Sequence, residues 1–211
     1  MVSPASGFTA PGSVLTVMAH PDDAELWAGG TLARCAATGA AVTVAVPRCT
    51  EPRASEAAAG AAVLGAGLYP FDLGCGEAVR ELLLEVKPDV VITHPPRDVH
   101  PEHRRVAEAL LDALPDVVIS TGYPRRVYAA DSYNSLTLDG PTPAHTIVDV
   151  SQVWQTKRRA LAAHASQPIT DHFGPMAEAL GRLWGMRVGA AYAENFVPLP
   201  VLGRLPEATA L

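Results

Sequence analysis

Hydrophobic and polar positions follow two alternating patterns along the chain: short apolar runs typical of strands, and longer alanine- and leucine-rich stretches with helical spacing. The short runs predict strands at 14–19, 41–46, 68–73, 89–93, 116–120, 126–130 and 146–150. The longer stretches predict helices at 23–38, 53–64, 77–86, 102–114, 151–165 and 176–187. Gly39 and Gly65 follow the first two helices as stop signals, and Ser151 is the expected cap of the fifth.

Strands and helices alternate regularly up to residue 120, which predicts a single α/β domain over 1–211. The expected architecture is a Rossmann-like, doubly wound, mostly parallel sheet with helices on both faces. The run at 89–93 lacks polar alternation, as a strand covered on both faces should. Residues 1–12 are expected to form a loose N-terminal tail. Pro198, Pro200 and Pro206 predict an irregular C-terminal tail over 198–211.

Composition limits the classes of function. The 211 residues are 48% hydrophobic, enough for a sizeable core, and no apolar stretch reaches the roughly 18–20 residues of a membrane helix. A net charge of −6 with scattered basic residues argues against nucleic acid and anionic membranes as partners. Cys35, Cys49 and Cys75 form no CxxC pair, and together with the lack of a secretory signal they favour a reduced, cytoplasmic protein. A homo-oligomer is left open.

The first cluster of chemically active residues is Ala19-His20-Pro21-Asp22-Asp23-Ala24-Glu25, directly after the first expected strand. Open α/β sheets place their sites at the carboxyl ends of strands. His20 and Asp23 offer an imidazole nitrogen and a carboxylate oxygen, a pair suited to Zn²⁺. Asp22 lies between them and is expected to stay unligated as a base. Glu25 is expected to be an ordinary acid in the first turn of a helix.

The second cluster, His94-Pro95-Pro96-Arg97-Asp98-Val99-His100-Pro101-Glu102-His103, follows the strand at 89–93. The carboxyl ends of parallel strands meet at one edge of a sheet, so this cluster should lie beside the first. His103 is the expected third ligand, which leaves a fourth position open for water, as in catalytic zinc sites. A lone histidine is usually structural, and His94 fits a loop residue equally well. The joint pattern nevertheless favours one zinc ion per chain over coincidence.

On these residues the chain resembles the LmbE-like, or PIG-L-type, zinc-dependent N-deacetylases. The resemblance rests on the motif at 19–25 and the D-x-H-x-E-H run at 98–103. It is supported by Arg53-Ala-Ser-Glu56, by Lys157 with His164-Ala-Ser-Gln167, and by Tyr192-Ala-Glu-Asn-Phe196. It implies His20, Asp23 and His103 as metal ligands, Asp22 as the general base, and His100 as an acid or oxyanion-stabilising residue. The chain departs from the family pattern at Ala24 and Glu102, and its segment between Glu56 and His94 is short.

The resemblance implies a hydrolase that uses metal-activated water to remove an N-acyl group, above all acetyl, from an amino sugar or a related glycosylated metabolite. An amidase acting on a thiol conjugate or another small amide is the alternative, and another divalent transition metal is the alternative to zinc. Arg53, Asp98 and His164 are candidate substrate-binding residues. Arg53 fits a surface ion pair with Glu56 nearly as well, Asp98 either orients the ring of His100 or is an ordinary loop carboxylate, and His164 fits a structural role.

Two readings from other classes of protein are weaker. The glycines at 60, 65 and 67 have the wrong spacing for a phosphate-binding loop and precede an expected strand, which argues against a nucleotide-binding module. A non-catalytic metal-binding protein would not need Asp22 left free beside two ligands.

Overall fold

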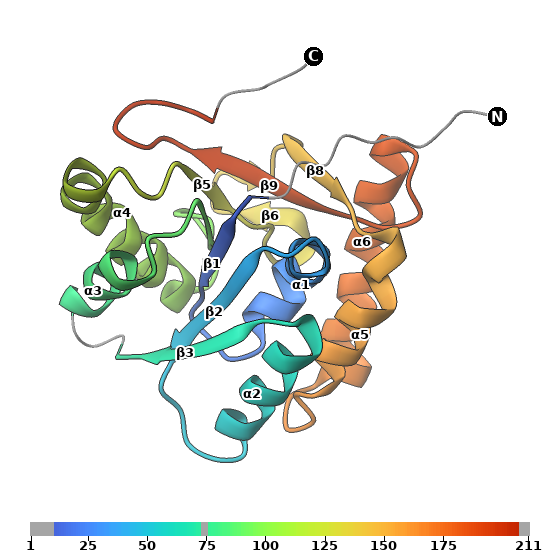
Figure 1. The fold of residues 1–211 in the computed structure, drawn as a ribbon. Coiled ribbons are helices and arrows are strands. Elements are labelled where there is room, and N and C mark those ends of the chain that lie inside the picture. Colours follow the sequence, from blue (N-terminus) through green and yellow to red (C-terminus); the bar gives the residue numbers. More distant parts are fainter. Residues whose placement is uncertain (1–10, 73–75, 207–211) are drawn as a thin grey trace.

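The computed structural model describes residues 11–72 and 76–206, so the expectations for residues 1–10, Cys75 and the last five residues lie outside it. A seven-stranded sheet with the order β3-β2-β1-β4-β5-β9-β8 forms its centre (Figure 1). The parallel strands are β1 (Ser13–Val17), β2 (Ala41–Pro47), β3 (Gly67–Phe71), β4 (Val90–Thr93) and β5 (Arg126–Ala129). Antiparallel β9 (Ala193–Leu199) and β8 (Thr146–Asp149) complete the sheet beside β5. The expected doubly wound α/β fold is confirmed.

Helices cover both faces of the sheet (Figure 1). One face packs against α1 (Asp23–Ala37), α2 (Arg53–Leu64) and α6 (Gly174–Val188), and α5 (Trp154–Ala162) packs on α1 and α2 as part of the same core. The other face packs against α3 (Gly76–Val86) and α4 (Pro101–Thr121). Strand side chains alternate between the two cores: Val14 packs with the first helix group, and Leu15 and Val17 pack with the second. No described helix is both long and apolar enough to cross a membrane.

The expected strand at 116–120 is wrong, because α4 continues through it to Thr121. Leu110, Leu114 and Val117 are all buried, so the helical spacing of the core face runs on past the proline. Pro115 lies on the exposed side of the helix. There the missing N–H affects a single solvent-facing turn, which a long, well-packed helix tolerates.

Two further differences affect the C-terminal third. β9 was not expected, and it extends to Leu199 with Pro198 in register with Tyr128. The segment 198–211 is therefore not irregular at its start. Ser151 does not cap a helix with its side chain; its hydroxyl donates to Asp149 Oδ1 at 2.6 Å. A short 3₁₀ turn, Ser151–Val153, precedes α5 instead.

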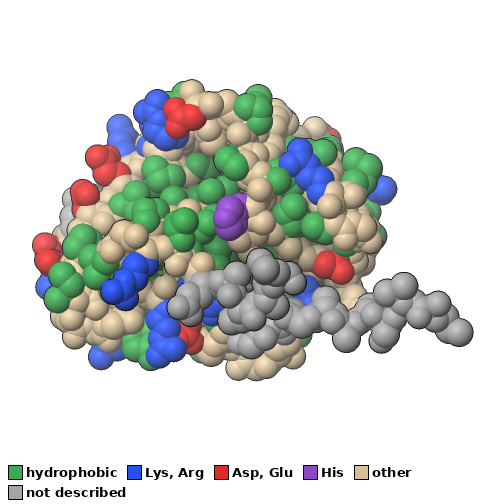
Figure 2. Space-filling view, turned by 90° about the horizontal axis from the view of Figure 1, so that it is seen from above, with side chains coloured by type: hydrophobic (Ala, Val, Ile, Leu, Met, Phe, Trp, Pro, Cys, Tyr) green, Lys and Arg blue, Asp and Glu red, His purple; other side chains and the backbone are tan. Residues whose placement is uncertain are grey.

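A small hairpin follows β5. The 3₁₀ turn Tyr133–Ser135 leads into β6 (Leu136–Thr137), which pairs with β7 (Gly140–Pro141). Figure 2 shows the upper face of Figure 1, where hydrophobic side chains cover much of the middle and charged side chains of both signs are scattered, mostly towards the edge.

Candidate active site at the carboxyl ends of β1 and β4

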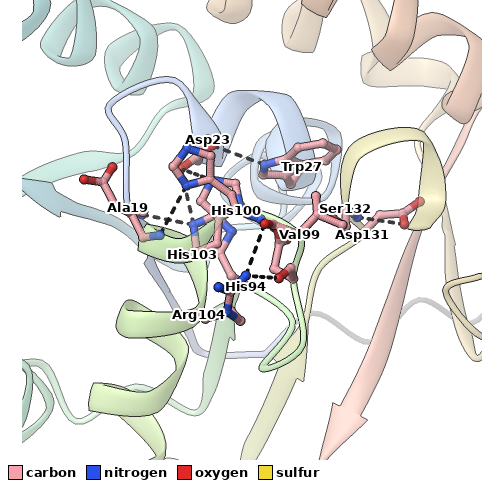
Figure 3. Close-up of polar contacts among 12 residues, drawn as sticks. Ala19, Asp23, Trp27, His94, Val99, His100, His103, Arg104, Asp131 and Ser132 are labelled. Carbon is pink, nitrogen blue, oxygen red and sulfur yellow. Dashed lines mark hydrogen bonds and ion pairs between the residues drawn. The ribbon is translucent and has the colours of Figure 1, made fainter. Parts of the chain in front are cut away.

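The strand order brings the two predicted clusters together. β1 and β4 are neighbours in parallel register, with Val14 opposite Val90. His20 lies in the turn after β1, and Asp23 is the first residue of α1. His103 lies in the first turn of α4, after the loop that leaves β4. All three side chains therefore reach the same edge of the sheet. Figure 3 shows Asp23 and His103 there.

His20, Asp23 and His103 form a compact triangle of donor atoms. His20 Nδ1 lies 3.1 Å from Asp23 Oδ2 and 3.2 Å from His103 Nε2, and the third edge, between His103 Nε2 and Asp23 Oδ2, is 3.5 Å. Ligands about 2.0–2.1 Å from a tetrahedral zinc ion are separated by about 3.3 Å. Both the chemistry and the spacing of this donor set fit a zinc ion.

A fourth imidazole, that of His94, packs against this triangle. His94 is fully buried, and its ring stacks on that of His103 with centroids 3.7 Å apart. Its Nε2 lies 3.2 Å from Asp23 Oδ2, but it also accepts the backbone N–H of Ala19 at 3.0 Å. A lone pair engaged by that N–H is not free for a metal. His94 is therefore a buried neighbour of the proposed ligands, at the start of the loop that follows β4.

Each of the three donors also contacts a second group on its far side. Asp23 Oδ1 accepts the indole N–H of Trp27 at 3.3 Å, and His20 Nε2 lies 2.7 Å from Glu102 Oε2. His103 Nδ1 lies 3.2 Å from Asp98 Oδ2. Such outer partners fix the orientation of metal ligands. Trp27 was missed by sequence reasoning, although its position four residues after Asp23 on a helix places both on one face.

The expectation for Asp98 needs correction. Its side chain is fully buried, so it cannot contact a substrate directly. Its Oδ2 faces the ring of His103 and not that of His100, while its Oδ1 accepts the backbone N–H of His100 at 2.7 Å. Burial alone would raise the pKa of Asp98, but these contacts outweigh it and lower the pKa. Asp98 therefore orients the proposed ligand His103.

Asp22 lies beside the triangle and is held by Arg53. Arg53 Nη2 lies 2.9 Å from Asp22 Oδ1, and the carboxylate is almost fully buried. Burial, and then the charge of Asp23, raise the pKa of Asp22, while Arg53 opposes the rise. Glu56 instead accepts hydrogen bonds from Ser166, so the alternative surface pair between Arg53 and Glu56 is not formed.

His100 lies at the opening of the site. Its ring centroid is 4.9 Å from that of His20 and 4.6 Å from that of His103. Its Nδ1 accepts the backbone N–H of Glu102 at 3.3 Å, which caps α4. Burial and the neighbouring His103 and His20 rings lower the pKa of His100. A neutral ring that accepts at Nδ1 carries its proton on Nε2, and that atom is then a hydrogen-bond donor.

Glu25 does not match its expected role, and His164 matches the structural alternative and not the substrate-binding one. Both are fully buried, and His164 Nε2 lies 3.5 Å from Glu25 Oε2. His164 is therefore not placed to bind a substrate, and Glu25 is not a solvent-facing helix acid. Gly60 makes room for the pair, since a Cβ there would lie 2.5 Å from Glu25 Oε1 and 2.9 Å from His164 Nε2. Burial raises the pKa of Glu25, although His164 opposes this.

The fold and the site thus define a class of protein: a doubly wound α/β domain with a cluster of histidines and carboxylates at the carboxyl ends of its strands. Residues 15–114, which include His20, Asp23 and His103, match the PIG-L family, described as GlcNAc-PI de-N-acetylase. The expected resemblance is confirmed: over these residues, just under half of the chain, the sequence matches the model of this family.

Related proteins match this chain either over a short segment at high sequence identity or over nearly the whole chain at low identity. The 1D-myo-inositol 2-acetamido-2-deoxy-alpha-D-glucopyranoside deacetylase of Actinosynnema mirum is 64% identical over 36 residues, which cover 17% of this chain and only 13% of that protein. N,N'-diacetylchitobiose deacetylase from Pyrococcus horikoshii is 19% identical, with a TM-score of 0.69 over 95% of this chain and 88% of that one. GalB, the 4-carboxy-2-hydroxymuconate hydratase of Pseudomonas putida KT2440, is 23% identical, with a TM-score of 0.74 over 94% and 99%. At these identities the two structures share the fold alone.

Proposed function

We propose that this protein is a metal-dependent N-deacetylase that acts on an acetylated amino sugar or a related glycosylated small metabolite. One observation carries the proposal: the donor triangle of His20, Asp23 and His103 lies beside Asp22, a buried carboxylate outside the triangle. The family match over 15–114 and the short match to an acetamido-sugar deacetylase support this reaction and substrate class.

His20, Asp23 and His103 would hold one zinc ion, because two imidazoles and a carboxylate with an open fourth position form a donor set typical of catalytic zinc. When bound, the ion would lower the pKa of a water molecule and polarise the amide carbonyl. Imidazole and carboxylate donors also suit other divalent transition metals, which remain the alternative to zinc.

The chain's own groups would divide the proton transfers between them. Asp22 accepts the proton of the attacking water and later donates it to the departing amine, and general base catalysis of this kind contributes about 10²–10⁴-fold. Arg53 engages Oδ1 of Asp22, which leaves Oδ2 to carry that proton. His100, through Nε2–H, donates to the negative charge that develops on the carbonyl oxygen. Asp98 keeps the ring of His103 in place.

The experiment that tests this function measures free amine release from N-acetylglucosaminyl compounds and, in parallel, from cysteinyl-amide conjugates. We expect release from the acetylated sugars, its loss after chelation, and its recovery when zinc is added back. Release from the thiol conjugates alone would favour the alternative amidase. Turnover that is insensitive to chelation would overturn the proposed role of the metal.

A further inference from the structure

The side chains around the donor triangle differ in polarity from one side of the site to the other. Asp22 and Arg53, which begins α2, form a charged side. On another side, the ring of Tyr133 lies nearly parallel to that of His103 with centroids 5.7 Å apart. Tyr133 also packs edge-to-face on Trp27 at 5.3 Å and lies 6.3 Å from the ring of Phe173. A proposed metal ligand therefore has an aromatic neighbour.

The turn that presents Tyr133 has a defined and unusual backbone. Asn134 and Ser135 both have positive φ values, 52° and 58°, which residues other than glycine adopt rarely. The turn is tied on both sides, since the N–H of Ser135 donates to Ser132 O at 2.9 Å and that of Thr142 donates to Ser135 O at 2.8 Å. Backbone strain of this kind persists where the surroundings enforce it, often near functional sites.

Beyond Tyr133 the hairpin is joined to the loop that bears Asp98 and His100. Asp98 and Thr137 form an antiparallel bridge, and the N–H of Leu138 donates to Arg97 O at 2.8 Å. This register places Val99 opposite Leu136, on the face opposite to the buried Asp98. Val99, Leu136 and Leu138 form what we call the apolar rim, with exposed fractions of 42%, 47% and 52%. Figure 3 shows Val99 beside His100 at the site.

From this arrangement we infer that the apolar rim, with Tyr133 at its inner end, binds the acyl side of the substrate, and that the protein accepts N-acyl groups longer than acetyl and prefers them to acetyl. The inference rests on the proposed function. The departing amine must reach Asp22 to receive its proton, so the amine and its polar carrier belong on the charged side with Arg53. The acyl group then extends the other way, towards the apolar rim. A patch of exposed apolar side chains at the edge of a site is typical of a binding surface.

The expected preference follows from apolar burial. Full burial of one methylene group contributes about 0.8 kcal/mol, which corresponds to about fourfold in kcat/KM. The rim is half exposed, so about twofold per methylene is the better expectation. Hexanoyl exceeds acetyl by four methylenes, which gives a preference of roughly tenfold or more.

The test compares N-acetyl-, N-butyryl- and N-hexanoylglucosamine as substrates of the wild type and of the double variant Leu136→Ser/Leu138→Ser. We expect kcat/KM to rise with chain length in the wild type, and the hexanoyl-to-acetyl ratio to fall towards one in the variant. Ile119→Ser and Met186→Ser are matched controls, because each replaces a large apolar side chain that is 75% exposed and lies outside the rim, in α4 and in α6. Neither control should change the ratio.

A wild type that prefers acetyl tenfold, or a rim variant that slows all three substrates equally, would overturn the inference. Calorimetric binding of the same three compounds to Asp22→Asn protein separates this failure from failure of the proposed function. If no compound is hydrolysed yet binding tightens with chain length and the rim variant abolishes the trend, the rim assignment stands and the deacetylase assignment falls. If binding shows no trend either, both fall.

Discussion

The ion pair between Lys157 and Glu194 joins α5 and β9 to the middle of α1, and breaking it should strongly destabilise the fold. Lys157 Nζ lies 2.6 Å from Glu194 Oε1, and each side chain is only 4% exposed. Lys157 also donates to the carbonyl of Leu26 at 2.8 Å, and Glu194 accepts the N–H groups of Gly30 and Thr31 at 2.9 and 2.7 Å. In a regular helix the Gly30 N–H would donate to Leu26 O. Here Glu194 accepts from that N–H and Lys157 donates to that carbonyl, so the ion pair contacts both partners of one helical hydrogen bond.

The single variants Glu194→Gln and Lys157→Met should lose different amounts of the free energy of unfolding. Glu194→Gln leaves the ammonium group of Lys157 buried without a carboxylate, a change that costs about 3–5 kcal/mol. Lys157→Met should cost less, about 2–3 kcal/mol, because Glu194 keeps two charge-assisted bonds from backbone N–H groups. The double variant leaves no uncompensated charge, so its loss should fall short of the sum by at least about 1 kcal/mol.

Urea unfolding of the four proteins measures these values through the midpoint and slope of each transition. Glu178→Gln serves as the control, because Glu178 pairs with Arg182 at 2.8 Å on the surface and its loss should not shift the midpoint measurably. An unpaired buried charge should account for most of the lost stability. This expectation would be refuted if each single variant lost less than about 1 kcal/mol of unfolding free energy, or if the loss in the double variant equalled the sum of the two single losses.

Three further predictions concern the site, and a fourth concerns the buried pair of Glu25 and His164. Asp22→Asn should retain metal yet lose about 10²–10⁴-fold in kcat; turnover near the wild-type value would exclude Asp22 as the base. His103→Ala should lose metal by elemental analysis whereas His100→Ala should keep it and lose kcat and kcat/KM together; the reverse pattern would exchange their roles. Burial lowers the pKa of metal-free His20, but Asp23 and Glu102 outweigh burial and raise it to about 9. Metal binding needs the neutral ring, so His20 should release close to one proton when metal binds at pH 7, and the Glu102→Gln protein should release less; calorimetry in buffers of different ionisation enthalpy measures this release. The apparent metal affinity should also increase with pH up to about 9. Equal proton release by the wild type and Glu102→Gln would contradict the prediction. Gly60→Ala should cost about 1–3 kcal/mol of stability, because its Cβ would overlap Glu25 and His164; unchanged stability would show that the buried pair can shift.

The N-terminal half of the fold could be predicted closely because its signals are local. The expected helix at 53–64 coincides with α2, whose C-terminal residue precedes a left-handed glycine, Gly65, with a φ of 75°. Two apolar strands followed by histidines and aspartates also identified the edge of the sheet where the site lies. That these two strands end at the same edge of the sheet follows from the general strand order of doubly wound folds, and not from any feature of this sequence.

The remaining features depend on contacts distant in sequence. Nothing local shows that Asp98 faces His103 instead of the nearer His100, since this depends on the loop between β4 and α4. The burial of Glu25 depends on Gly60, which lies in α2, and on His164, which lies just after the end of α5. β9 was missed because its prolines hide a strand that is defined by its partners β5 and β8.

The position of β9 has a consequence for the order in which the molecule can assemble. The carboxylate of Glu194 meets backbone groups that precede it by 164 and 163 residues. Such long-range closure is a slow event in folding, and during synthesis it must wait for β9 to leave the ribosome. The chain that carries the donor histidines is made early, but α1 acquires the partner of its backbone groups only once β9 has been made. A nascent chain therefore has all its candidate ligands long before α1, the helix that carries Asp23, is held by Glu194.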